Sequence, residues 1–141
     1  MNVRPSRYCF TSLSFKKGNY MALSGKNLIA GEWSGDTAGG FIAFDAIKNQ
    51  PMATTFADAT TSEIDQAILR ANEAFVSYSQ LPAGKRANFL RQIGEEIVAL
   101  GDELVEIASA ETGLPAARIQ GERGRTVGQL GLFANLLDSG E

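Results

Sequence analysis

The chain has no histidine, one cysteine (Cys9) and four prolines among its 141 residues. Without histidine it lacks the usual general base and the commonest metal ligand. A single cysteine excludes an internal disulfide framework, and one thiol with scattered carboxylates gives no metal-ligand spacing. No apolar run approaches the roughly 20 residues that span a bilayer. We therefore expect no metal site and no membrane insertion, and the chain is poor in the side chains that catalysis uses.

Acidic residues are absent from the first 31 positions, which carry five Lys or Arg residues. Residues 32–141 carry eight basic and sixteen acidic groups, a net charge of −8 compared with −3 for the whole chain. A field of that sign repels phosphate backbones, so we expect no nucleic-acid partner. The composition, with 44% hydrophobic and 21% charged residues, is typical of a soluble domain of one compact unit.

Residues 1–20 differ from the rest because they are basic, rich in Ser, Tyr and Phe, and without periodicity. Residues 21–24 (MALS) read like a start of translation, which indicates a disordered leader or an over-called start codon before them. A second interpretation is a targeting sequence, since transit peptides are Arg- and Ser-rich and acid-poor. No apolar core of roughly 7–15 residues follows the charges, which disfavours a secretory signal. We expect a cytoplasmic protein.

Strand patterns follow the leader. Residues 27–33 and 41–44 are short apolar runs that flank a Gly- and Asp-rich stretch, residues 34–40. Two such runs around a turn predict a β-hairpin with a loop longer than the tight two-residue type. Residues 52–56 predict a third strand after a turn at Pro51.

From Thr60 onward the apolar spacing becomes helical. Thr60 and Glu63 form a capping-box pattern, in which the two residues satisfy free N–H groups at a helix start. Apolar residues at spacings of three and four then predict a helix over residues 61–79 with one apolar stripe. The stripe consists of Ile64, Ala67, Ile68, Ala71, Ala74, Phe75 and Tyr78.

Proline and glycine divide the remaining chain into further helices. Pro82 predicts a helix start, Gly101 permits a break, and Gly113 predicts a stop. Pro115 opens the last helix, with Ile119, Thr126, Leu130, Phe133 and Leu137 expected on one side. Helices gain most of their stability from tertiary packing, and one hairpin offers too little partner surface for these. We therefore expect that a larger body completes the fold.

Two stretches resemble the aldehyde dehydrogenase family. Residues 28–33 (LIAGEW) are similar to the opening strand of that family, which leads to a small-residue helix ending in Ala-Phe, here residues 74–75. Pro82-x-x-x-Arg86 resembles the start of the family's second helix, which leads to a Glu-Thr-Gly stop at residues 111–113. The resemblance covers about residues 25–137. It departs at residues 45–50, where the family usually has an Asn-Pro or Asp-Pro turn followed by Thr-Gly.

Residues 111–134 (ETGLPAARIQGERGRTVGQLGLFA) give a narrower likeness. They resemble the branch that oxidises α-ketoglutaric semialdehyde (2,5-dioxopentanoate) to α-ketoglutarate, and related bacterial fatty-aldehyde enzymes. Gly131 stands where that branch leads us to expect an arginine. Two alternatives stay open: a fragment of a broad or fatty-aldehyde dehydrogenase, and a non-catalytic truncated helical module that binds a partner.

The resemblance implies an α/β parent fold, of which this fragment supplies a β-hairpin and three to four amphipathic helices. Residues 21–141 would be the first, incomplete part of the NAD(P)-binding domain. In the family a cysteine thiolate attacks the aldehyde, hydride passes to NAD or NADP, and a glutamate activates water. Those motifs follow residue 141 in the family order, so we expect no catalytic and no cofactor-binding residue in this chain. The complete enzyme would be a homo-oligomer that acts on a small-molecule aldehyde.

Several residues invite a functional interpretation that we do not favour. Cys9 lies in the leader without a family motif, which is typical of a free thiol. Glu111 is expected in the last turn of a helix. Glu122 is expected to pair with Arg118 or Arg125 on its own helix. Residues 121–124 (GERG) lack the preceding strand that a phosphate-binding loop needs.

Arg125 is the one candidate substrate-binding residue. With Arg118, Glu122 and Gln129 it forms a polar face on the last predicted helix. The resemblance places Arg125 along the tunnel by which substrate enters. An Arg fork binds a carboxylate in bidentate fashion, and α-ketoglutaric semialdehyde carries a distal carboxylate. The alternative is a surface salt bridge with Glu122, worth about 0.5 kcal/mol if exposed.

Overall fold

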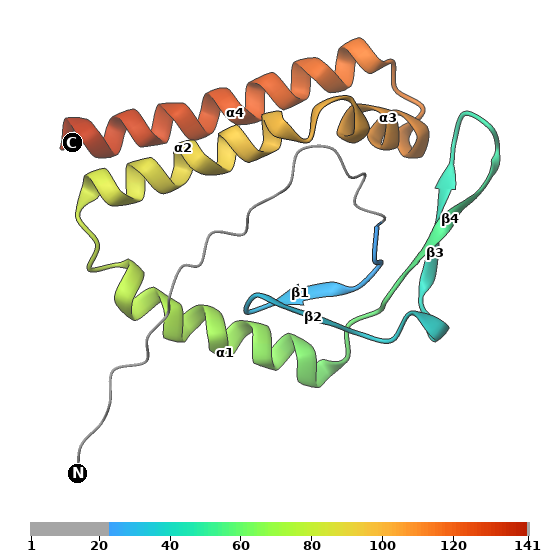
Figure 1. Ribbon diagram of the computed structural model, residues 1–141, viewed down its shortest axis with the longest axis horizontal. Coiled ribbons are helices and arrows are strands. Elements are labelled where there is room, and N and C mark those ends of the chain that lie inside the picture. The colour runs from blue at the N-terminus through green and yellow to red at the C-terminus, as the bar shows by residue number, and fades with distance from the viewer. Residues whose placement is uncertain (1–22, 141) are drawn as a thin grey trace.

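A computed structural model describes residues 23–140, in which two β-hairpins are followed by four helices (Figure 1). The predicted leader, residues 1–20, and Cys9 lie outside the described residues. The order of elements confirms the expected arrangement of strands first and helices afterwards. The pairing of the strands differs from the prediction.

The first hairpin joins β1 (Asn27–Ile29) to β2 (Glu32–Ser34), with Leu28 opposite Trp33. The turn residues Ala30 and Gly31 have φ angles of 53° and 87°. Two central residues with positive φ form the two-residue turn whose twist suits a tight hairpin. The predicted pairing of residues 27–33 with residues 41–44 is therefore wrong, because this turn divides the first run into two strands that pair with each other.

The second hairpin joins β3 (Phe41–Asp45) to β4 (Gln50–Phe56), after a short 3₁₀ turn, η1 (Thr37–Gly39). The third predicted strand is confirmed, but its partner is β3 and its turn lies before Pro51, not at it. Pro51 stands inside β4, opposite Phe44. Proline is tolerated there because a two-stranded ribbon leaves each strand an open edge.

The first two helices begin where the sequence predicts. In α1 (Thr61–Tyr78) the Thr60 hydroxyl accepts a hydrogen bond from the Glu63 backbone N–H at 3.2 Å. Both arms of the capping box are present, so that prediction is confirmed. Pro82 directly precedes α2 (Ala83–Ala99).

Two left-handed glycines separate the later helices. Gly101, with a φ of 61°, divides α2 from α3 (Gly101–Thr112), and Gly113, with a φ of 71°, ends α3. The last helix, α4 (Ala116–Ser139), follows Pro115. The predicted break and the predicted stop are both confirmed.

The tightest packing lies between α2 and α4, which run side by side (Figure 1). Ala87 and Gly94 of α2 and Ala134 of α4 are buried there. A Cβ at Gly94 would meet the Val127 side chain at 3.4 Å, an ordinary contact distance, so α2 and α4 lie close together at this position. Two members of the predicted α4 stripe, Thr126 and Phe133, are instead exposed, since the face that packs against α2 lies further round the helix.

The hairpins attach to the helices at few points. The Ala46 N–H donates to the carbonyl of Ala110 at 2.7 Å, which joins the second hairpin to α3. Helix α1 contacts β1, and the Tyr78 ring meets the Phe89 ring of α2 edge-on at 5.9 Å. No helix among residues 23–140 is long and apolar enough to cross a membrane.

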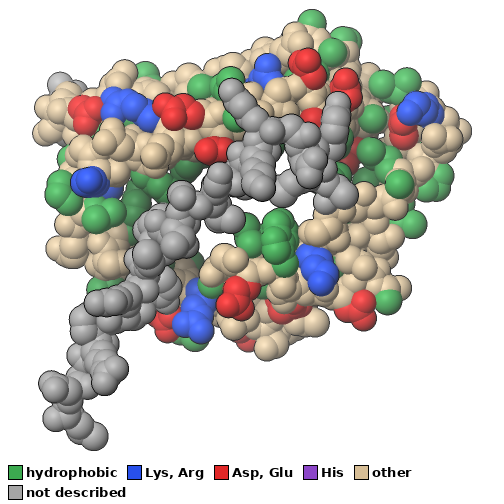
Figure 2. All heavy atoms as spheres, in the orientation of Figure 1, with side chains coloured by type: hydrophobic (Ala, Val, Ile, Leu, Met, Phe, Trp, Pro, Cys, Tyr) green, Lys and Arg blue, Asp and Glu red, His purple; other side chains and the backbone are tan. Residues whose placement is uncertain are grey.

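The described residues bury little apolar surface. Only four hydrophobic residues among them are buried, and these are small or medium-sized: Ala57, Ala87, Val105 and Ala134. The α1 stripe has the predicted spacing but lies open, with Ile64, Ile68 and Phe75 each 49% to 64% exposed. Hydrophobic side chains also gather at several separate places on the face shown in Figure 2. The fold therefore presents apolar faces that nothing in the described chain covers.

Candidate functional site

A three-residue ionic cluster lies on the exposed side of α4, in its first half. Arg118 Nη2 lies 2.8 Å from Glu122 Oε1, and Arg125 Nη2 lies 2.9 Å from Glu122 Oε2. The helix itself produces this arrangement, because positions three and four residues apart lie on one face. The predicted polar face is present, and Glu122 pairs with both arginines.

The cluster carries a net positive charge, because one carboxylate lies between two guanidinium groups. The Arg125 side chain is 79% exposed and that of Arg118 is 66% exposed. Ion pairs this open to water contribute about 0–1 kcal/mol. An incoming carboxylate can therefore bind the unused N–H groups of either guanidinium, or replace Glu122, at small cost.

An open hollow of about 470 Å³ lies beside the start of α1. Three acidic residues, Asp36, Asp58 and Glu63, are part of its lining. Glu63 accepts hydrogen bonds from the Ser34 hydroxyl and from the Thr60 N–H and hydroxyl, the latter two both at 2.9 Å. The Ser34 hydrogen bond is the main reason why the pKa of the Glu63 carboxyl lies below its ordinary value. These bonds tie the first hairpin to the cap of α1, so Glu63 has a structural role.

Asp45 closes the turn between β3 and β4, at the position where the sequence departs from the family pattern. Its carboxylate is buried and accepts from the N–H groups of Ile47 at 3.0 Å and Lys48 at 2.8 Å. The Lys48 N–H is the largest influence that lowers the pKa of the Asp45 carboxyl. Asn49, with a φ of 54°, completes the turn. The hydrogen bonds of the Asp45 side chain therefore close this turn, although the chain lacks the proline that the family usually has here.

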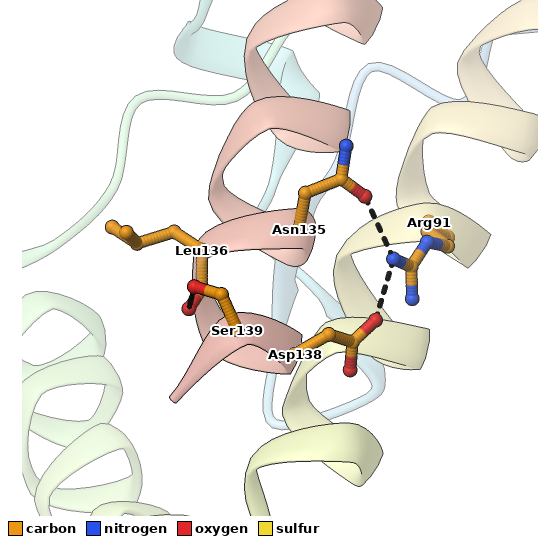
Figure 3. Close-up of polar contacts among 5 residues, drawn as sticks. All are labelled: Arg91, Asn135, Leu136, Asp138 and Ser139. Atoms are coloured by element: carbon orange, nitrogen blue, oxygen red, sulfur yellow. Dashed lines mark hydrogen bonds and ion pairs between the residues drawn. The ribbon is translucent and has the colours of Figure 1, made fainter. Parts of the chain in front are cut away.

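A further ionic link joins α2 to the end of α4 (Figure 3). Arg91 Nη2 donates to Asn135 Oδ1 at 2.9 Å and to Asp138 Oδ2 at 2.7 Å. Arg123 Nη1 donates to the Gly101 carbonyl at 2.6 Å, at the break between α2 and α3. Sequence reasoning missed both links, because each joins residues more than 20 positions apart with no local pattern.

Residues 23–140 contain no cysteine and no histidine. No set of three or more His, Cys, Asp or Glu side chains among them could hold a metal ion. Glu111 lies exposed in the last turn of α3, as expected. Residues 121–124 lie inside α4, so they form no phosphate-binding loop. Residues 23–140 form two antiparallel hairpins and contain no parallel strand–turn–helix unit.

Residues 35–141 match the model of the aldehyde dehydrogenase family. The chain belongs to this family. Enzymes of the family are in general NAD(P)-dependent and act on aldehydes. The resemblance that the sequence motifs indicated is therefore confirmed.

Relatives with established names extend this family match. The chain is 50% identical over 121 residues to α-ketoglutaric semialdehyde dehydrogenase 2 of Azospirillum brasilense, and 42% identical over 118 residues to α-ketoglutaric semialdehyde dehydrogenase of Acinetobacter baylyi. It is 30% identical over 100 residues to the mitochondrial succinate-semialdehyde dehydrogenase of Rattus norvegicus. The three alignments cover 85%, 84% and 71% of this chain.

The chain spans only about a fifth to a quarter of these relatives, since the alignments cover 23%, 22% and 19% of their lengths. The names favour the semialdehyde branch that residues 111–134 predicted. They do not favour the fatty-aldehyde or the non-catalytic alternative.

Proposed function

We propose that this chain supplies the N-terminal part of an NAD(P)-dependent dehydrogenase that oxidises α-ketoglutaric semialdehyde to α-ketoglutarate. The 50% identity over 85% of the chain to an enzyme of that name carries the proposal. Residues 21–141 would form the first, incomplete part of the NAD(P)-binding domain. The nucleophile, the general base and the dinucleotide site would come from the polypeptide outside these residues, and the complete enzyme would be a cytoplasmic homo-oligomer.

We further propose that Arg125 binds the distal carboxylate of the substrate. Its guanidinium is open to water, and its one ion-pair partner among residues 23–140, Glu122, also engages Arg118. A planar guanidinium can form two parallel hydrogen bonds to a carboxylate, which gives orientation as well as affinity. The aldehyde end of the substrate would then point away from α4, toward groups that the rest of the enzyme supplies.

A chimeric enzyme tests the proposed function. The matched segment of the Azospirillum brasilense enzyme is replaced by this chain, and formation of NADH or NADPH is followed with α-ketoglutaric semialdehyde and with a neutral aldehyde of similar length. We expect a folded enzyme that prefers the semialdehyde by at least about tenfold in kcat/KM, since a charge-assisted pair contributes roughly 1.5–3 kcal/mol. A folded chimera without that preference, when the parent enzyme has it, would overturn the proposal.

A further inference from the structure

A carboxylate of α4 itself contacts the arginine to which we assign the substrate. Glu122 Oε2 lies 2.9 Å from Arg125 Nη2, and the other oxygen, Oε1, lies 2.8 Å from Arg118 Nη2. Each guanidinium thus contacts a different oxygen of one side chain. Glu122 presents to Arg125 the same chemical group as the distal carboxylate of α-ketoglutaric semialdehyde, so the two carboxylates compete for one guanidinium.

This competition can take two forms. An incoming carboxylate can displace Glu122 from Arg125, which breaks an ion pair, or it can bind the N–H groups of Arg125 that Glu122 leaves unused. In the second case two negative charges lie against one guanidinium and repel each other. Both forms weaken the binding of a carboxylate to Arg125. The effect is modest, because water largely surrounds both arginine side chains and screens the charges.

Arg118 makes the exchange reversible. Because it contacts the other oxygen, Glu122 can leave Arg125 and keep an ion pair with Arg118. The three side chains lie on one face of α4, since Arg118 is four residues before Glu122 and Arg125 is three residues after it. A change of side-chain rotamer is therefore enough, and the helix backbone need not move.

We infer that Glu122 is a specificity-determining residue, which competes with the carboxylate of the ligand for Arg125 and so limits the affinity of the site for acidic ligands. The inference rests on the proposed function and on the assignment of Arg125. It extends to the product, because oxidation of the aldehyde group leaves the distal carboxylate unchanged. The same competition therefore weakens inhibition by α-ketoglutarate.

Glu122→Gln in the chimera with the Azospirillum brasilense enzyme removes the charge and keeps the size of the side chain. We expect the KM for α-ketoglutaric semialdehyde and the inhibition constant of α-ketoglutarate to fall by about twofold to fivefold, the factor that corresponds to an exposed ion pair. The KM for a neutral aldehyde of similar length should not change. Glu106→Gln, which removes a negative charge from an exposed position of α3, is the matched control and should alter none of these constants.

A double variant shows whether the effect passes through Arg125. In a chimera that carries Arg125→Ala, the added Glu122→Gln should leave the KM for the semialdehyde unchanged, because the contested guanidinium is gone. An unchanged or raised KM in the single Glu122 variant would overturn the inference, as would an equal fall for the neutral aldehyde or a full effect without Arg125. In an active chimera these outcomes overturn the inference alone. A chimera that does not oxidise the semialdehyde would overturn the proposed function as well.

Discussion

Arg125 and Glu122 show how far a single residue can be interpreted from its helix position. The spacing on α4 accounts for the ion pair, and the structure confirms it at 2.9 Å. The same spacing accounts for the Arg118 pair, so the pairing itself does not distinguish the two arginines. What distinguishes them is the direction in which each faces within the complete enzyme, which depends on chain outside residues 23–140.

Replacement of Arg125 by alanine in the chimera should raise the KM for α-ketoglutaric semialdehyde by about tenfold to a hundredfold. The reason is the loss of a charge-assisted pair worth roughly 1.5–3 kcal/mol. The KM for a neutral aldehyde should not change. Arg118→Ala is the matched control, since it removes the other partner of Glu122, and it should change neither value by more than about twofold. An equal rise for both aldehydes in the Arg125 variant would contradict the assignment.

Glu63 should make the chain less stable in acid. The Ser34 hydrogen bond lowers the pKa of its carboxyl in the folded chain below the ordinary value of 4.5. The unfolded chain therefore binds the proton more readily, and the stabilisation is present above about pH 4.5 and lost as the pH falls through the folded-state pKa. Glu63→Gln should flatten this dependence while keeping a capping side chain.

Urea midpoints measured between neutral pH and pH 3 provide the test. Glu106→Gln, which removes one negative charge from an exposed position elsewhere on the helices, is the control for the change in net charge. Asp45, whose carboxyl pKa is also lowered, should leave a residual slope in the Glu63 variant. An unchanged acid slope in Glu63→Gln would contradict the assigned role.

At the scale of elements, helices could be predicted from the sequence more accurately than strand pairing. Helix starts and stops depend on residues close in sequence, such as Thr60, Pro82 and Gly113, so local chemistry determines them. Strand pairing depends on turn geometry. Ala30 adopts a positive φ, which residues other than glycine rarely do. The sequence therefore did not indicate the two-residue turn at this position. The exposed position of Phe133 also depends on which neighbour α4 has.

The stability of α3 should depend on the glycine at position 113, which forms the C-terminal cap of the helix. It ends the helix with a φ of 71°, where an alanine Cβ is strained although its nearest neighbour, the Ala46 Cβ, is at an ordinary 3.6 Å. Gly113→Ala should therefore lower the free energy of unfolding by about 1 kcal/mol. Gly121→Ala, at a helical and open position of α4, should raise it by up to ~1 kcal/mol. Urea denaturation of both variants tests the contrast, and a stabilised Gly113→Ala chain would show that the left-handed cap is absent.

Across residues 23–140 the four helices share only a small hydrophobic core. Twenty large hydrophobic side chains among the described residues are more than a third exposed, whereas the buried ones are mainly alanines. Apolar faces of this kind mark contact surfaces or lead to aggregation. The structure thus supports the expectation, made from helix periodicity alone, that these helices pack against a larger body.

The 141-residue chain by itself should bind the dye ANS and show a low, broad unfolding transition, because exposed apolar surface with loose tertiary packing has these properties. The full-length chimera should bind much less dye per chain, since the same faces would be covered. Fluorescence titration of both proteins at equal concentration makes the comparison. Equal, weak dye binding by the two would mean that the isolated chain already covers its apolar faces.

The central claim is that this sequence works as part of a semialdehyde dehydrogenase. The most direct measurement is the mass of the native product that carries α4, isolated from its source cells and assayed for NAD(P)⁺-linked oxidation of α-ketoglutaric semialdehyde. We predict a product several times heavier than 15.1 kDa that forms α-ketoglutarate. A native product of 15.1 kDa that does not oxidise the semialdehyde would contradict the claim.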